Sequence, residues 1–151
     1  MIVVDTSAWV EFLRDTGSPV CIAVDRLLDD DIAICDPISM EVLAGARSEQ
    51  HLSQLRGLLA RATLLPTTPA DYDSAAALYR TCRTSGATVR KLIDCLIGAV
   101  AIAADAEVLH ADADFNGLAA HTSLRVHSAA TGDPIREQNV PAPTRPSQHR
   151  G

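Results

Sequence analysis

The chain has 151 residues and a formal net charge of −6, and 47% of its residues are hydrophobic but only 3% are aromatic. This composition is sufficient for one domain with a sizeable aliphatic core. The acidic balance argues against a protein that coats nucleic acid, and the few aromatic residues argue against rows of base-stacking side chains. A nucleic-acid enzyme whose carboxylates hold metal ions stays possible, because bound cations reverse the local charge.

The cysteine spacing and the N-terminal sequence indicate the cellular compartment. Cys21, Cys35, Cys82 and Cys95 have no C-x-x-C spacing, which leaves zinc and redox motifs unsupported. The N-terminus lacks the pattern of a signal peptide, and the longest apolar run, Cys95–Ala104, is too short to span a bilayer. We therefore expect a soluble cytoplasmic protein with reduced thiols and no membrane contact.

Along the first part of the chain, Ile2–Val4 predicts a strand and Ala8–Arg14 a short helix. The apolar spacing of Val20–Leu28 predicts a second helix. A second strand is predicted at Ile32–Ile34. The next helix is expected to begin at Pro37 and to run to about Ala46, because proline suits the first helical position.

The remaining elements continue the alternation of strands and helices. Helices are predicted at Glu49–Ala62, Pro69–Ser85 and Leu92–Ala104, and strands at Thr63–Leu65, Glu107–His110 and, weakly marked, Leu124–His127. This alternation predicts an α/β fold, a three-layer sandwich in which a central parallel sheet has helices on both faces. We expect one domain over residues 1–129. The Pro-rich stretch 130–151 has no apolar period and predicts an unfolded tail.

Five carboxylates lie where acidic residues are unusual. Asp5 ends the first strand, Glu41 lies one turn into an apolar helix, Asp94 lies in a helix that is apolar on nearly every side, and Asp112 and Asp114 follow a strand. An ionised carboxylate in a buried helix is unfavourable unless it is paired or bound to metal. Two of them have an ordinary explanation: Asp5 could cap a helix, and Lys91 could simply pair with Asp94 across one helical turn.

The predicted topology brings most of these acids together. In a parallel α/β sheet, ligands bind beyond the carboxyl ends of the strands, where Asp5, Glu41, Asp112 and Asp114 are expected. Asp94 joins them only if the preceding loop crosses the sheet first. Oxygen ligands of this kind suit Mg²⁺ or Mn²⁺. We also expect the metal-free carboxylates to repel each other, so that Asp112→Asn would raise the stability of the metal-free protein.

The four blocks "VVDTS", "MEVLAGA", "KLIDCLIGAVA" and "LHADADF" resemble PIN-domain ribonucleases, and most closely VapC-type toxins of bacterial toxin–antitoxin pairs. The resemblance covers about residues 1–128 and the order and spacing of all four blocks. It implies a Mg²⁺- or Mn²⁺-dependent endoribonuclease with an RNA substrate. It also implies a homodimer, and a cognate VapB-type antitoxin that places a basic side chain among the acids.

By position, the resemblance implies that Asp5, Glu41, Asp94 and Asp112 form the catalytic and metal-binding quartet. Asp114 matches a further acid, Ser7 a supporting hydroxyl, and Thr6 a weaker candidate for that role. His110 stands where the family often has Thr or Ser. His110 could act as a general base or simply pack, and Arg83, Arg90 and Lys91 could position RNA or lie on a solvated surface.

Two other classes of function share parts of this pattern: another phosphoryl-transfer protein, as a phosphatase or a receiver domain, and a non-catalytic binding module. Haloacid-dehalogenase-type phosphatases also open with a strand ending in Asp, but they have a second Asp two residues on, where this chain has Ser7. A receiver domain pairs its acids with a Lys at a strand end, whereas the only lysine here, Lys91, begins a helix. A non-catalytic binding module on the same fold is the remaining alternative, and the complete acidic set argues against it.

Overall fold

The computed structural model describes residues 1–129, and the tail predicted for 130–151 lies outside them. Four parallel strands form the sheet in the order β3-β2-β1-β4. They are β1 (Ile2–Val4), β2 (Ile32–Cys35), β3 (Thr63–Leu65) and β4 (Glu107–Leu109). In the register of the sheet, Val3 of β1 is paired with both Ala33 and Val108. The apolar runs of β1 and β2 are typical of strands that are covered on both faces.

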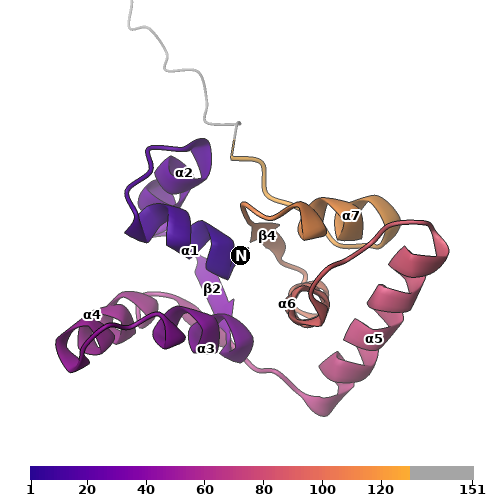
Figure 1. The fold of residues 1–151 in the computed structure, drawn as a ribbon, viewed down its shortest axis with the longest axis horizontal. Helices are drawn as coiled ribbons and strands as arrows, with labels where there is room; N and C mark the ends of the chain where they lie inside the picture. Colours follow the sequence, from indigo (N-terminus) through magenta and orange to yellow (C-terminus); the bar gives the residue numbers. More distant parts are fainter. Residues whose placement is uncertain (130–151) are drawn as a thin grey trace, which may run out of the picture.

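Seven helices connect and cover these strands within residues 1–129: α1 (Thr6–Leu13), α2 (Pro19–Leu27), α3 (Asp36–Ala44), α4 (Glu49–Leu59), α5 (Pro69–Thr84), α6 (Leu92–Ala103) and α7 (Ala113–His121). The chain steps from β1 to β2 to β3 in one direction and then returns past them to β4. Because parallel crossovers are right-handed, α1–α4 and α5–α6 lie on opposite faces. Figure 1 shows α1–α4 on one side and α5–α7 on the other, which confirms the α/β architecture predicted from the sequence.

The direction of α6 resolves the placement of Asp94. α6 immediately precedes β4, which runs parallel to β1, and residues 94–101 of α6 are all buried. A helix that feeds a parallel strand returns from the carboxyl edge of the sheet to its amino edge. The first turn of α6, with Asp94, therefore lies at the carboxyl edge, where β1 ends in Asp5.

Most predicted elements are confirmed within a few residues, and α1 shows why the ends differ. α1 begins at Thr6, two residues before the predicted start, because the Asp5 carboxylate accepts the Ser7 amide hydrogen and caps the helix. The predicted last strand, Leu124–His127, was wrong. This segment contributes a single parallel bridge between Val126 and Val108.

Helix α7 was not predicted. Its sequence, "ADFNGLAAH", contains Asn116 and Gly117, which disfavour a helix in isolation. Asp112 caps its start, and the fully buried Phe115 and Leu118 dock it against the core beside α5 and α6. Tertiary packing therefore outweighs local propensity in this segment.

The described residues contain no helix that combines the length and the apolar character needed to cross a lipid bilayer. All four cysteines lie in this part of the chain, and they are free and buried. Burial raises the pKa of Cys35 to about 12 and that of Cys95 to about 11, so both are uncharged thiols at neutral pH.

Two glycines allow a direct test of this packing. A methyl group added at Gly98 in α6 would meet the side chains of Leu118 and Leu124 at 3.7 Å, an ordinary contact distance. Since alanine favours a helix over glycine by about 0.8–1.0 kcal/mol, we expect Gly98→Ala to raise the free energy of unfolding by ~0.5–1 kcal/mol in urea titrations. Gly86 has φ +80°, so Gly86→Ala should instead lower it by ~1 kcal/mol. Destabilisation by Gly98→Ala would show that α6 packs more tightly than described.

Candidate metal centre

The carboxyl edge of the sheet carries the five predicted acids on four separate elements. Asp5 directly follows β1, and its amide donates to the Leu109 carbonyl at 3.0 Å, which extends the β1–β4 ladder by one residue. Asp112 caps α7 and Asp114 lies in its first turn. Because β1 and β4 are neighbours, this pairing places Asp5 beside the segment that leads to Asp112.

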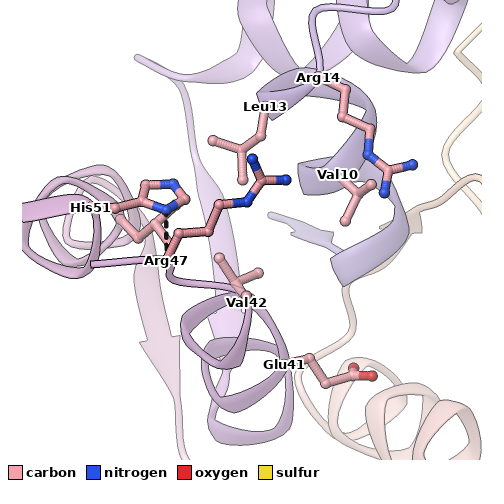
Figure 2. Close-up of a pocket in the computed structure, with 9 residues that line it drawn as sticks. Val10, Leu13, Arg14, Glu41, Val42, Arg47 and His51 are labelled. Atoms are coloured by element: carbon pink, nitrogen blue, oxygen red, sulfur yellow. Dashed lines mark hydrogen bonds between the residues drawn. The ribbon is translucent and has the colours of Figure 1, made fainter. Parts of the chain in front are cut away.

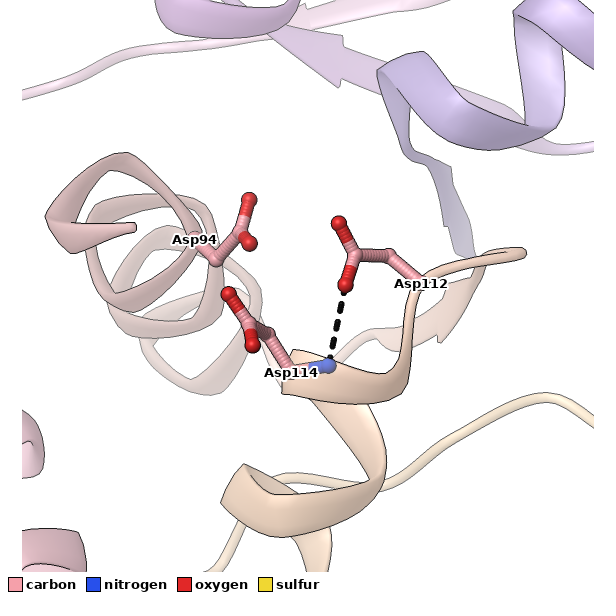
Figure 3. A group of neighbouring side chains, drawn as sticks. All are labelled: Asp94, Asp112 and Asp114. Carbon is pink, nitrogen blue, oxygen red and sulfur yellow. Dashed lines mark hydrogen bonds between the residues drawn. The ribbon is translucent and has the colours of Figure 1, made fainter. Parts of the chain in front are cut away.

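Three of the acids form a compact cluster. Asp94, Asp112 and Asp114 each offer a carboxylate oxygen, and these atoms all lie within 4.8 Å of one another (Figure 3). Asp94 and Asp114 are buried and Asp112 is half-buried. The Asp114 amide donates to Asp112 at 3.0 Å, so the start of α7 holds both of its acids in place.

The other two acids face Asp94 across a cleft. Asp5, Glu41 and Asp94 line the same cleft, of about 300 Å³, together with Lys91. The structure therefore brings all five predicted positions to one site, with Asp94 common to the cleft and the cluster. Their role as ligands stays a prediction at this point.

Two hydroxyl groups orient the acids that come from the first half of the chain. Ser7 Oγ donates to Asp5 Oδ2 at 2.6 Å and accepts the Ala111 amide hydrogen at 2.9 Å. Thr6 Oγ1 donates to Glu41 Oε1 at 2.8 Å and so ties α1 to α3. Sequence reasoning ranked Thr6 below Ser7, yet each hydroxyl holds one carboxylate.

Two cationic side chains enter the cluster from the residues that precede α6. Lys91 Nζ lies 2.8 Å from Asp112 Oδ2 and 3.7 Å from Asp94 Oδ2, so its main partner is not the Asp three residues along the chain. Arg90 reaches Asp112 at 3.2 Å and Asp114 at 3.3 Å, and the Arg90 and Lys91 amides also donate to Asp114. These contacts fix the start of α6 against the start of α7.

Burial and these partners give the acids different pKa values. The pKa of Asp94 is raised to about 8, first by burial and then by a hydrogen bond with Asp114. Burial also raises the pKa of Asp114, but hydrogen bonds with Asp94 and Arg90 outweigh it and lower the pKa overall. In the metal-free protein at neutral pH, Asp94 therefore keeps its proton and donates it to the Asp114 carboxylate. Burial likewise raises the pKa of Asp5.

The expectation for Asp112 was wrong. Burial raises the pKa of Asp112, but its hydrogen bonds with Lys91 and the Asp114 amide, together with the Lys91 and Arg90 charges, lower it overall. Attraction to these cations, rather than repulsion between carboxylates, dominates at this residue. Neutralising Asp112 should therefore destabilise the metal-free protein.

Two carboxylate oxygens show that the centre fits a divalent cation. Asp5 Oδ1 and Asp94 Oδ2 are buried without a hydrogen-bond partner. Asp94 Oδ2 has only the Lys91 ammonium nearby, at 3.7 Å. A buried carboxyl oxygen without a hydrogen bond is unfavourable, and a hard cation with oxygen ligands satisfies it once the carboxyl group is ionised. The donor set here consists of carboxylate oxygens, which suits Mg²⁺ or Mn²⁺ rather than zinc.

The other polar residues named from the sequence have structural partners. His110 Nδ1 accepts the Asp112 amide hydrogen at 3.1 Å, and its ring lies 5.1 Å from that of Phe115, so His110 packs and supports the loop. Arg83 lies over the Tyr79 ring at 5.8 Å. The sequence left Arg90 either as a contact to RNA or as solvated surface, because no local pattern reveals ion pairs to residues more than twenty positions away.

Comparisons with known proteins agree with this geometry. The family model of the PIN domain matches residues 2–120. The ribonuclease VapC11 of Mycobacterium tuberculosis is 44% identical over 132 residues, which cover 85% of this chain and 98% of VapC11. A VapC ribonuclease of Mycobacterium bovis has the same identity and coverage.

Solved structures show the same fold at low sequence identity. VapBC2 from Rickettsia felis, bound to a DNA fragment from its promoter, matches with a TM-score of 0.68 at 20% identity and covers 84% of this chain and 98% of its own. VapC20 of Mycobacterium tuberculosis, described as a sarcin–ricin loop cleaving toxin, matches with a TM-score of 0.61 at 16% identity over 83% of this chain and 99% of its own.

The raised pKa of Asp94 predicts how metal-free stability depends on pH. The folded protein retains this proton up to about pH 8, whereas an ordinary Asp loses it near 3.8. The folded state then binds more protons than the unfolded state, so the free energy of unfolding falls as pH rises through this interval. Burial lowers the pKa of His110 from 6.5, so below pH 6.5 this residue makes the free energy of unfolding rise with pH and opposes the effect of Asp94. The clearest window is therefore pH 6.5 to 8.

Asp94→Asn isolates this contribution, because the amide keeps a hydrogen-bond donor for Asp114 but cannot ionise. In EDTA, we expect the stability of the variant relative to wild type to grow with pH, by at most about 1.4 kcal/mol per pH unit for one proton. Urea unfolding at several pH values measures this difference. Parallel stability curves for the two proteins would contradict the assignment.

Proposed function

The chain belongs to the PIN-domain family and, within it, to the VapC ribonucleases, and from this membership we propose that it is the toxin of a toxin–antitoxin pair and a metal-dependent endoribonuclease. The observation that carries the proposal is the acidic centre, in which Asp94, Asp112 and Asp114 converge and two buried carboxyl oxygens lack a hydrogen-bond partner. The 44% identity to mycobacterial ribonucleases favours RNA as the substrate.

We assign Asp5, Glu41, Asp94, Asp112 and Asp114 as the residues that hold Mg²⁺, or Mn²⁺ in its place. When bound, such an ion lowers the pKa of a water molecule and stabilises charge on a scissile phosphate. The protein supplies a fixed set of oxygens. Ser7 and Thr6 contribute by holding Asp5 and Glu41 at 2.6 Å and 2.8 Å.

Lys91 and Arg90 give the centre a defined metal-free arrangement. Both cations contact Asp112, so a metal ion competes with them for that carboxylate. Their side chains are 50% and 68% exposed, which leaves them free to turn away from Asp112 toward a phosphate. Lys91 and Arg90 therefore balance the acids before the substrate arrives and are placed to contact its backbone afterwards.

The polar side chains beside the acids make structural contacts, and Ser7 Oγ donates to Asp5 Oδ2 at 2.6 Å. His110 uses Nδ1 to hold the Asp112 amide and is packed against Phe115. Burial lowers its pKa, so the ring is neutral at physiological pH. We propose hydrolysis by a water molecule activated at the metal centre, and Ser7 stands where haloacid-dehalogenase-type phosphatases have their second Asp.

We propose a protein antitoxin as the regulatory partner. Similar solved structures include a toxin–antitoxin complex from Klebsiella pneumoniae and FitAB bound to DNA. The acidic centre already accepts cationic side chains from Arg90 and Lys91, so a basic side chain from an antitoxin would find the same partners. A small protein that inserts such a side chain would block both metal and RNA.

A homodimer is the assembly implied by the family resemblance. Met40 of α3 and Leu92 of α6 are 60% and 63% exposed, and the two helices contact each other. Large apolar side chains at such exposure favour a protein contact. We propose that this surface contributes to self-association.

Asp5→Asn should retain the fold and lose metal-dependent cleavage of RNA by at least about a hundredfold, because the amide lacks the charge of a metal ligand. The loss of cleavage is measured by gel analysis of total cellular RNA incubated with the protein in Mg²⁺ and in EDTA. The matched control is Asp30→Asn at an exposed position outside the centre, which should cleave like wild type. Full activity of a folded Asp5→Asn protein would refute the assignment.

Metal binding should stabilise the protein. A ligand that binds only the folded state at a hundredfold excess over its Kd adds about 2.7 kcal/mol to the free energy of unfolding, so Mg²⁺ or Mn²⁺ should raise Tm. Asp112→Asn should lower the Tm of the metal-free protein, since it loses the Lys91 contact at 2.8 Å, and should also weaken the response to metal. An unchanged metal response in differential scanning fluorimetry would exclude Asp112 as a ligand.

A further inference from the structure

A second cleft adjoins the acidic centre. It has a volume of about 360 Å³ and lies between α1, α3 and α4 (Figure 2). Val10 and Glu41 line both this cleft and the one that contains Asp5 and Asp94. A linear polymer bound across the acidic centre can therefore continue into the second cleft.

The second cleft gathers unpaired cationic side chains. Arg14 ends α1 and Arg47 lies between α3 and α4, and Figure 2 shows both side chains extending over the cleft. Within residues 1–129, neither guanidinium forms an ion pair or a hydrogen bond. The charge of Arg14 contributes to the lowered pKa of Glu11, but the two side chains form no ion pair. By contrast, the guanidinium groups of Arg61 and Arg125 are both paired with aspartates.

His51 adds an N–H donor of fixed orientation. Its Nδ1 accepts the backbone amide hydrogen of Arg47 at 3.1 Å (Figure 2). An imidazole that accepts through Nδ1 carries its proton on Nε2 when it is neutral. His51 therefore presents an N–H donor beside the two guanidinium groups, and this set of donors matches the oxygens of a phosphate.

Apart from Glu41, where the cleft meets the acidic centre, the rest of its lining is apolar. Leu13, Val42 and Leu55 contribute side chains to its wall, and Leu13 is 44% exposed. A wall of this kind matches a ribose or base rather than a second phosphate. The volume lies within the usual range for small-molecule sites.

We propose that this cleft binds one nucleotide of the RNA substrate that flanks the scissile bond, with its phosphate on Arg14, Arg47 and His51. The inference rests on the proposed ribonuclease function and names a substrate contact for it. The chain has a net charge of −6, and the acids gather where RNA must approach. Cations held beside the acidic centre offset that repulsion at the point where the strand continues.

The test compares RNA binding and cleavage in matched variants. The variants are Arg14→Gln, Arg47→Gln and the double variant, with Arg56→Gln as the control because Arg56 is exposed on α4 but does not line the cleft. Binding is measured by fluorescence anisotropy with a labelled 12-nucleotide single-stranded RNA in Mg²⁺. All proteins in this assay also carry Asp94→Asn, which prevents cleavage.

We expect the double variant to raise the Kd for this RNA about tenfold and Arg56→Gln to leave it unchanged. Loss of this one phosphate contact on a single strand should also reduce the slope of log K against log salt by about 0.7. Arg14→Lys/Arg47→Lys should restore the salt slope, because the charges return. In proteins with an intact Asp94, cleavage should show a raised KM with kcat nearly unchanged.

The outcomes separate this inference from the proposed function. Absence of metal-dependent RNA cleavage by the wild type overturns the proposed function. Cleavage by the wild type, with equal Kd, salt slope and KM in the double variant and Arg56→Gln, overturns only the nucleotide site. Unchanged RNA binding with lost affinity for a labelled glutamate-rich peptide would assign the cleft to a protein partner and also overturn it.

Discussion

The burial of carboxylates at one edge of the sheet is the constraint on which the functional site depends. Asp5 and Asp94 are 3% and 2% exposed and lie at the ends of elements that are otherwise apolar. Such groups are tolerated only when they are protonated, hydrogen-bonded or bound to cations. Here all three solutions operate: Asp94 keeps a proton, Ser7 donates to Asp5, and Lys91 and Arg90 approach Asp112.

These compensations define a site that is organised before metal or substrate binds. Arg90 and Lys91 join the start of α6 to the start of α7, while Thr6 and Ser7 join α1 to α3 and to the loop after β4. The oxygens of the acidic centre are therefore held by contacts outside the centre itself. Preorganisation of this kind lowers the free-energy cost of assembling the ligands of a metal ion, which must still displace Lys91 from Asp112 and the proton from Asp94.

The sequence was sufficient for the sheet, because the apolar runs that end in Asp5 and near Asp36 are local signals. Parallel topology was also sufficient to place four of the five acids at one edge, whereas the place of Asp94 depended on the family resemblance and on a crossover that the spacing did not establish. Contacts between distant residues were not predictable in the same way. Arg90 meets Asp112 and Asp114 only after α5 and α6 have folded back, and α7 is helical through burial of Phe115 despite its Asn and Gly. The Arg14–Arg47 cleft has no signature in the sequence for the same reason.

The location of a bound Mn²⁺ ion tests the central claim most directly. Crystals of the full chain grown with Mn²⁺ would place the ion by its anomalous scattering. The account predicts a peak within the acidic centre, in contact with Asp94 and Asp5 oxygens, and a Lys91 ammonium displaced from Asp112. A peak elsewhere, or no peak at this edge of the sheet at saturating Mn²⁺, would contradict it.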